Sequence, residues 1–212
     1  MIGGGEHAAV VADAVRSRPH EWYALGFADP APPPDASRRL GLDHLGGDDV
    51  VIRLLADARA DPPALVLGFG SAAARRAAAV ETFGGATWAT VVHAAAWVSP
   101  SAEIGEGSVV FAGAVVNAGA RLGRHVIVNS GAIVEHDVQL DDFAHVGPGA
   151  TIGGAARVGR ETYLGLGAVV RDHVVIGPGA MVGMGAVVVD EVKPGTTVIG
   201  SPARPRESVT GR

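Results

Sequence analysis

Large aliphatic residues recur at every sixth position through the second half of the chain. Of the eighteen such positions from residue 92 to residue 194, seventeen are Val, Ile or Leu, and the last is Pro194. The residue four places after each of them is small or β-branched in every unit. Neither an α-helix, with about 3.6 residues per turn, nor a strand, with alternation about every two residues, sustains a six-residue period. The pattern therefore predicts a solenoid whose stacked coils bury one large and one small side chain per unit.

The first 91 residues lack this repeat, and apolar segments there alternate with alanine-rich ones. We expect helices over residues 8–18 and 72–80, strands over residues 22–27, 64–67 and 87–92, and a strand–helix edge over residues 50–59. Strands that alternate with helices favour a parallel sheet. The sequence thus predicts two domains, a small α/β domain over residues 1–91 and a β-solenoid domain over residues 92–212.

The composition excludes several classes of protein. The 212 residues include 31 glycines and are 48% hydrophobic, which is typical of a folded chain with many turns. A net charge of −5 argues against a large basic surface for nucleic acid, and the absence of cysteine excludes disulfides, cysteine metal sites and thiolate nucleophiles. The N-terminal segment lacks the basic and apolar regions of a signal peptide, and every 18-residue run contains polar residues. We therefore expect a cytoplasmic protein without membrane insertion.

Beyond the repeat, six segments resemble a single family and keep its spacing throughout. They are residues 3–7 (GGGEH), 26–29 (GFAD), 68–75 (GFGSAAAR), 129–137 (NSGAIVEHD), 142–146 (DFAHV) and 192–204 (VKPGTTVIGSPAR). Together with the six-residue repeat they resemble the hexapeptide-repeat acetyltransferases, in the group of sialic acid O-acetyltransferases and nucleotide-amino-sugar N-acetyltransferases. The chain departs from that group at Glu6-His7-Ala8, where Gly-His-Gly is common, and at Ser71, where Asn is common.

The resemblance implies a left-handed parallel β-helix with three six-residue faces per coil, closed by a C-terminal cap. It implies that the first domain is a Rossmann-like sugar-nucleotide-binding domain, and that the protein is a homotrimer with active sites between neighbouring β-helices. It also implies acetyl-CoA as co-substrate and no metal. The leading interpretation is transfer of an acetyl group from acetyl-CoA to the amino group of a nucleotide-linked amino (dideoxy) sugar.

His136 and Asp137 are the candidate catalytic residues. The six-residue count places His136 just after an inward position, so its side chain should point outward near an edge of the prism. Residues 118 and 154, one coil before and one coil after, are Ala and Gly, which leaves an open notch. A histidine can remove the proton of an attacking nucleophile, and an adjacent carboxylate fixes its tautomer. The resemblance assigns His136 the role of general base; an ordinary exposed histidine is the alternative.

On the cofactor side, the resemblance implies contacts of acetyl-CoA with His145, Gly154, Leu166, Gly183 and Met184. The last three lie one or two coils further along a predicted groove for the pantetheine arm. For His145 the alternative is a turn histidine at a subunit interface.

On the substrate side, the glycine-rich loop before the first expected helix can bring backbone amides close to a phosphate. The loop is not a full G-x-G-x-x-G motif, so we do not predict NAD. The candidate substrate-binding residues are Gly5, Glu6, His7, Asp29 and Gly70. A plain strand–helix turn is the alternative for the loop, and a turn aspartate before Pro30 is the alternative for Asp29.

Three other functions stay open. O-acetylation of sialic acid or a related sugar is the nearest alternative; we favour an amine because it is the better nucleophile toward a thioester. A non-catalytic trimeric sugar-nucleotide-binding module is the second. A metallohydratase of the γ-carbonic-anhydrase type is the third, and it requires three histidines that converge on one metal. His125, His136, His145 and His173 lack the H-x₄-H spacing of such enzymes.

Overall fold

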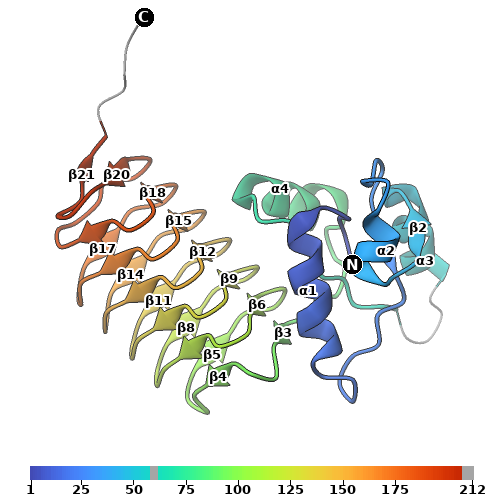
Figure 1. Cartoon of the computed structure of the whole chain (residues 1–212). Coiled ribbons are helices and arrows are strands. Elements are labelled where there is room, and N and C mark those ends of the chain that lie inside the picture. Colours follow the sequence, from blue (N-terminus) through green and yellow to red (C-terminus); the bar gives the residue numbers. More distant parts are fainter. Residues whose placement is uncertain (58–61, 207–212) are drawn as a thin grey trace, which may run out of the picture.

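The computed structural model describes residues 1–57 and 62–206. A helix-rich N-terminal part lies beside the start of a long β-helix (Figure 1). Residues 58 and 59 of the expected strand–helix edge, and residues 207–212 of the expected second domain, lie outside the described residues. The boundary expected between residues 91 and 92 falls within the first strand of the β-helix, β3 (Val91–Val92).

The N-terminal part is a parallel sheet flanked by helices. The helices are α1 (Glu6–Arg16), α2 (Ala36–Leu40), α3 (Asp48–Asp57), α4 (Ala72–Arg76) and the π-helical turn η1 (Ala77–Thr82). The sheet holds β1 (Phe27–Ala28) and β2 (His44–Gly46), extended by parallel bridges at Ile2, Leu65, Leu67 and Trp88. Across the sheet the segments run in the order 44–46, 27–28, 2, 65–67 and 88, so the first segment of the chain is central. This is the strand order of a Rossmann-like sheet, and the α/β fold predicted for this part is confirmed.

The strand predicted over residues 22–27 is wrong except at its end. Phe27 donates a backbone hydrogen bond to Asp43 O (3.0 Å), and Gly26 O accepts one from the terminal amine of Met1 (2.9 Å). Among the described residues, none forms a ladder with residues 22–25. An apolar segment becomes a strand only where a neighbouring backbone pairs with it.

The strand–helix edge predicted over residues 50–59 is also wrong, because its described residues belong wholly to α3. Asp48 and Asp49 occupy the first turn of α3, where carboxylates favour the helix, and the helix buries Val51 against the sheet. The helix predicted over residues 72–80 is present as α4 followed by η1.

The β-helix consists of short strands on three faces. The docked face contains β3, β6 (Val109–Val110), β9 (Ile127–Val128), β12 (His145–Val146), β15 (Tyr163–Leu164), β18 (Met181–Val182), β20 (Thr197–Ile199) and β21 (Arg204–Pro205). The aliphatic face contains β4 (Trp97–Val98), β7 (Val115–Val116), β10 (Ile133–Val134), β13 (Thr151–Ile152), β16 (Val169–Val170) and β19 (Val187–Val188). The polar face contains β5 (Glu103–Ile104), β8 (Arg121–Leu122), β11 (Gln139–Leu140), β14 (Arg157–Val158) and β17 (Val175–Ile176).

From β3 to β19, neighbouring strands on one face are parallel and eighteen residues apart. Ile133, for example, pairs with Val115 on one side and with Thr151 on the other. Three six-residue units therefore form one coil, and the predicted left-handed parallel β-helix is confirmed. The large and small positions of the repeat form one continuous core, in which Val134 and Ala132 are both fully buried.

The three faces carry different outward side chains. On the docked face, Val91, Val109 and Ile127 are buried in a cluster with Val11 and Val15 of α1. On the polar face the outward residues are exposed and mostly charged or polar, namely Glu103, Arg121, Gln139, Arg157 and Val175. On the aliphatic face they are almost all apolar and partly or largely exposed, namely Trp97, Val115, Ile133, Thr151, Val169 and Val187.

A buried arginine joins the two parts. Arg75 of α4 is 2% exposed, and its guanidinium donates hydrogen bonds to the backbone carbonyls of Gly70, His125, Phe143 and Ala144. Burial lowers the pKa of Arg75 to about 10, so it stays protonated at neutral pH. Because the loop that contains Gly70 and two turns of the β-helix share this one cation, their relative positions are fixed.

The C-terminal end of the β-helix is closed by an antiparallel pair. β20 continues the docked face beside β18, and β21 folds back on β20 with Val198 opposite Pro205. This pairing covers the last parallel edge, which would otherwise expose unpaired backbone groups.

Candidate active site

The candidate catalytic pair occupies the turn between β10 and β11, at the edge between the aliphatic and polar faces. Asp137 has a φ of 59°, in the left-handed region that Asp tolerates better than most residues. Its N–H donates to Ala118 O of the preceding coil (3.0 Å), and His136 O accepts from Ala155 N–H of the following coil (2.9 Å). The turn is thus held from both sides while its two side chains project into solvent.

The side chains of His136 and Asp137 form a hydrogen bond. Nδ1 of the imidazole lies 3.0 Å from Oδ2 of Asp137, and the two side chains are 62% and 67% exposed. This hydrogen bond raises the pKa of His136, and the negative charge of Glu135 acts in the same direction. Since a carboxylate only accepts, a neutral His136 carries its proton on Nδ1 and presents Nε2 as the base.

Gly154, in the next coil, makes room for the imidazole of His136. A Cβ at position 154 would lie 2.6 Å from Nε2 and 2.7 Å from Cε1 of that ring. The backbone of Gly154 does not have a positive φ, so its lack of a side chain serves the ring rather than the turn. The sequence argument for an open notch at His136 and the geometry agree.

His145 lies on the docked face, where loops of the α/β part reach the coils. Its side chain is 8% exposed, with Nδ1 3.3 Å from Gly70 O and Nε2 3.2 Å from Nδ2 of Asn129. Burial, together with the charge of Arg75, lowers the pKa of His145 to about 3. The ring is therefore neutral, with the proton on Nδ1. Asn129 begins the segment NSGAIVEHD, but sequence reasoning gave it no role.

His7 faces the same cluster from the start of α1. Its ring centroid is 6.1 Å from that of His145 and 5.5 Å from that of Phe111. Burial, with the charge of Arg75, lowers the pKa of His7 to about 4, and Nε2 is buried without a hydrogen-bond partner in the described part of the chain. A buried unpaired nitrogen is costly, so a polar ligand group at this position would stabilise it.

The glycine-rich loop leads into the N-terminus of α1 with Gly5 as its N-cap. A Cβ at Gly5 would meet no atom within 4 Å, so the loop is open on that side. Asp29 accepts hydrogen bonds from Gly4 N–H (2.8 Å) and Ala31 N–H (2.9 Å), one on each carboxylate oxygen. Asp29 therefore shapes the loop, in the geometry expected of a turn aspartate.

Two charged side chains flank this loop. Glu6, the first residue of α1, is exposed. Arg39 of α2 reaches across and donates from Nη2 to Gly4 O (2.6 Å), while its Nε is buried without a partner among the described residues. Sequence reasoning missed Arg39, since no local motif surrounds it and its distance from Gly4 along the chain is large.

Leu166, Gly183 and Met184 lie at a different edge, between the docked and aliphatic faces. Leu166 and Met184 occupy equivalent turns of adjacent coils and are 50% and 78% exposed. Gly183 faces β20, since a Cβ there would lie 2.7 Å from Cγ2 of Ile199. Within one copy of the chain, the width of the aliphatic face separates this edge from His136.

The predicted site residues thus fall into separate places. His136, Asp137 and Gly154 share the edge between the aliphatic and polar faces, whereas His7, Gly70 and His145 meet on the docked face. In a three-sided prism, the edge between two faces lies opposite the third face. Within one copy, the catalytic pair and the glycine-rich loops therefore lie on opposite sides of the β-helix.

Within residues 1–57 and 62–206, no group of three or more His, Asp or Glu side chains is placed to hold a metal ion. None of the helices described there has the length and apolar character needed to cross a membrane.

Neither a protein-family model nor a curated protein matches the chain. Several solved structures do. A mutant of perosamine N-acetyltransferase from Caulobacter crescentus, solved with CoA and GDP-perosamine, is 31% identical over 98% of this chain and 95% of that chain, with a TM-score of 0.88. The acetyltransferase domain of PglB from Neisseria gonorrhoeae, solved with acetyl coenzyme A, is 34% identical over 97% of both chains, with a TM-score of 0.87. WeeI from Acinetobacter baumannii, at 24% identity and a TM-score of 0.80, shares the fold.

The chain shares its β-helix of six-residue units and its α/β N-terminal part with these sugar acetyltransferases. The similarities are above 30% identity and span nearly all of each chain. The chain therefore belongs to the hexapeptide-repeat sugar N-acetyltransferases, which use acetyl-CoA. The family predicted from the sequence is confirmed.

Proposed function

We propose that this protein acetylates the amino group of a nucleotide-linked amino (dideoxy) sugar, with His136 as general base. The observation that carries the proposal is the His136–Asp137 hydrogen bond of 3.0 Å on an open turn above Gly154. The likeness to an enzyme solved with CoA and GDP-perosamine supports the same substrate class.

The reaction follows from the orientation of the imidazole. The amine nitrogen of the sugar attacks the thioester carbonyl of acetyl-CoA, so a C–N bond forms. Nε2 of His136 removes a proton from that nitrogen, and Asp137 stabilises the resulting imidazolium. The C–S bond then breaks, and the CoA thiolate leaves with the proton that the imidazolium returns. A positioned base of this kind contributes about 10²–10⁴-fold in rate.

For acetyl-CoA, we propose a site between two copies of the chain. Gly154 supplies a backbone contact beside the imidazole of His136 in one copy, and His145 of the neighbouring copy contacts acetyl-CoA. Leu166, Gly183 and Met184 pack against the pantetheine arm; the exposure of Leu166 and Met184 supports this, since apolar side chains on a turn suit an apolar chain. The reaction as written requires no metal.

For the nucleotide, we propose a site at the carboxyl ends of the sheet segments. The loops after Ile2 and Leu67 diverge there, and α/β sheets bind nucleotides at such a switch point. Gly5, Glu6, His7, Asp29 and Gly70 are the proposed contacts. The amides at the start of α1 face a phosphate, and Arg39 supplies a cation that sequence reasoning did not find. Acetyl-CoA and nucleotide sugars are cytoplasmic metabolites, and we propose that compartment.

We propose a homotrimer with its active sites between copies. The aliphatic face exposes a row of apolar side chains, including Trp97 at 58% and Val169 at 42%, which suits burial against another copy. Within one copy the proposed nucleotide site and His136 lie on opposite sides of the β-helix. A second copy is needed to bring a bound sugar to the imidazole.

The test is a comparison of acceptors. Acetyl-CoA is offered with UDP-, GDP- and dTDP-linked 4-amino sugars and, separately, with sialic acid, and free CoA is measured. We expect faster CoA release with at least one nucleotide-linked amino sugar. Faster acetylation of free sialic acid than of every amino-sugar nucleotide would favour the O-acetyltransferase, and nucleotide-sugar binding without CoA release would favour a binding module. A fully active monomer in light scattering would contradict the trimer.

A further inference from the structure

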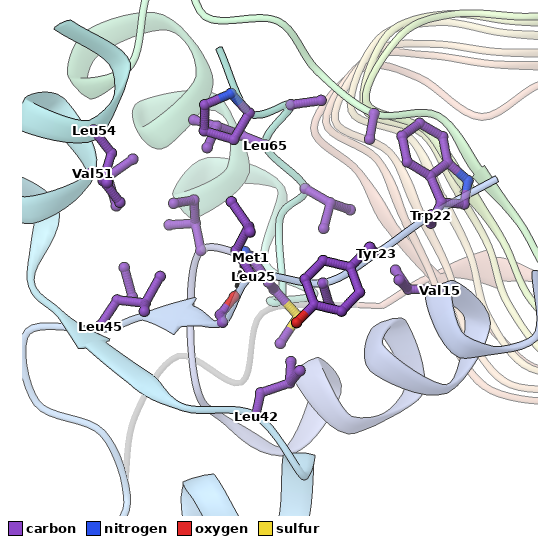
Figure 2. Close-up of a pocket in the computed structure, with 18 of the residues that line it drawn as sticks. Met1, Val15, Trp22, Tyr23, Leu25, Leu42, Leu45, Val51, Leu54 and Leu65 are labelled. Carbon is purple, nitrogen blue, oxygen red and sulfur yellow. Dashed lines mark hydrogen bonds between the residues drawn. The ribbon is translucent and has the colours of Figure 1, made fainter. Parts of the chain in front are cut away.

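Two buried features of the α/β part have no role in the reaction as written above. One is a cavity of about 570 Å³, where Figure 2 shows Leu25, Leu45 and Leu65 around Met1. The described residues that line it include no His, Asp, Glu, Lys or Arg side chain, so its side chains offer no ionic chemistry at neutral pH. The other feature is the guanidinium of Arg75, which carries a full charge.

Arg75 is the only buried side chain in the described part of the chain that is charged at neutral pH. Glu161 lies close enough to act on this charge, yet its carboxylate pairs with Arg76 instead (3.4 Å). A buried charge is costly, and the four carbonyls that bind the guanidinium supply hydrogen bonds without a neutralising charge. The charge of Arg75 therefore acts on the other polar groups buried beside it.

The nearest of these groups is the imidazole of His145, which shares an acceptor with Arg75. Gly70 O accepts one hydrogen bond from Nη1 of Arg75 and one from Nδ1 of His145 (3.3 Å). Nη2 of Arg75 also donates to the backbone carbonyls of residues 143–144, directly before His145. Because a carbonyl only accepts, Nδ1 of His145 carries the proton, and Nε2 accepts from Nδ2 of Asn129 (3.2 Å).

A second histidine shares this environment. The ring centroid of His7 lies 6.1 Å from that of His145, and the ring of Tyr163 meets His145 edge-on at 5.0 Å. Burial, followed by the charge of Arg75, lowers the pKa of both imidazoles, to about 4 for His7 and about 3 for His145. Among the described residues, no carboxylate acts on either ring. A proton added to His145 would therefore place two buried cations on the same carbonyl.

We infer that Arg75 is a positioning residue for acetyl transfer, which holds the imidazole of His145 neutral with its Nδ1–H on Gly70 O. The inference rests on the proposed function, in which His145 contacts acetyl-CoA. A protonated ring would bring an N–H on Nε2 against the amide hydrogens of Asn129, so one of these two side chains would have to turn away. With Arg75 in place, His145 presents the same face to acetyl-CoA over the pH range in which His136 works as a base.

The test compares Arg75→Met, which removes the charge and all donors, with Arg75→Lys, which keeps a charge at this position. Arg76→Met is the matched control, because Arg76 is the exposed neighbour on the same helix. Each form is labelled with ¹⁵N-histidine and titrated by NMR, since the two ring nitrogens report the tautomer and charge of His145. Calorimetry at pH 7 gives the Kd of acetyl-CoA. Neither measurement uses a sugar, so a wrong choice of acceptor would leave both unaffected.

We expect His145 of the parent chain to keep its proton on Nδ1 and to stay neutral at pH 5, and likewise in Arg75→Lys and Arg76→Met. In Arg75→Met we expect Nδ1–H and Nε2–H forms to coexist, protonation to begin at a higher pH, and the Kd of acetyl-CoA to rise about tenfold. An unchanged tautomer or an unchanged Kd in Arg75→Met would overturn the inference. An Arg75→Lys variant that changes as much as Arg75→Met would also overturn it.

Two further measurements decide the matter if Arg75→Met does not fold. Arg75→Gln keeps two donors without the charge, and its spectra and Kd are read in the same way. The parent chain needs no substitution at all: a His145 that is protonated at pH 5, or that carries its proton on Nε2, would overturn the inference.

Discussion

The β-helix and the α/β part hold their site residues in different ways. In the β-helix, the backbone of His136 and Asp137 is bonded to the coils on either side, as at the equivalent turns of other coils. In the α/β part, single side chains hold the loops: Asp29 and Arg39 bind Gly4, and Arg75 binds Gly70. The repeat thus positions the candidate catalytic residues, while a few long-range contacts position the loops proposed to bind the nucleotide sugar. Substitutions in the two parts should therefore affect kcat and KM separately.

The largest effect is expected for His136→Ala. Loss of the base should lower kcat by about 10²–10⁴-fold, while acetyl-CoA still binds. Steady-state kinetics and calorimetric titration of acetyl-CoA measure the two quantities. His173→Ala is the matched control, because His173 lies at the same edge of the prism and Ala155 shows that alanine tolerates the same positive φ. Near-normal turnover of His136→Ala would remove His136 from the mechanism.

Gly154→Ala should act on the same step without removing any catalytic group. The new Cβ would lie within 2.7 Å of the imidazole of His136, so the ring must rotate away from its present position. We expect kcat to fall by about tenfold or more, since small displacements of a catalytic group are costly. Circular dichroism should show an unchanged fold, and Gly47→Ala, remote from the site, serves as the control. Unchanged kcat would mean that the ring position seen here is not the reactive one.

Arg39→Ala tests the α/β part. Loss of the cation beside the glycine-rich loop should raise KM for the nucleotide sugar by about five- to tenfold and leave kcat nearly unchanged. Arg38→Ala is the control, because Arg38 is the exposed neighbour on the same helix. A fall in kcat with an unchanged KM would contradict the division of roles between the two parts.

The smallest effect is expected for His125→Phe, which tests how the parts are joined. His125 is 1% exposed and stacks on Phe143 at 5.1 Å; both ring nitrogens lack partners among the described residues. Phe143 has a φ of 61° at the equivalent turn, close to the 54° of His125, so phenylalanine suits the position. We therefore expect Tm at pH 7 to be equal or higher in the variant.

The pH dependence supplies a second measurement. Burial lowers the pKa of His125 to about 4 from an ordinary value of 6.5. The unfolded chain thus binds the proton more readily between these values, and His125 costs stability as pH falls from about 6.5 to 4. Between pH 7 and pH 5, Tm should fall less in the variant than in the parent, by about 2–4 °C. Identical slopes would mean that His125 does not titrate on unfolding.

The sequence predicts the β-helix well because a pattern of neighbouring residues, repeated every six positions, specifies which side chains point inward. Each unit repeats the same inward positions, so the placement of His136 near an edge and the open notch at Gly154 follow from counting. The α/β part depends on contacts between distant residues. Arg39 meets Gly4, and Gly70 meets His145 of the β-helix, through folding that no local pattern reveals. The strand expected over residues 22–27 fails for the same reason, since only its end, at Gly26 and Phe27, meets the backbone of another sheet segment among the described residues.

The eighteen-residue register has a consequence for how such a chain can change its length. Adding or removing eighteen residues within the coils after Gly154 would return every later residue to its own face, so the prism would only become longer or shorter. A change of six residues would instead turn everything after it by one third of a revolution. The polar, aliphatic and docked surfaces of the later coils would then no longer line up with those of the earlier ones. Insertions and deletions that keep the three faces aligned are therefore multiples of eighteen residues, which is one coil.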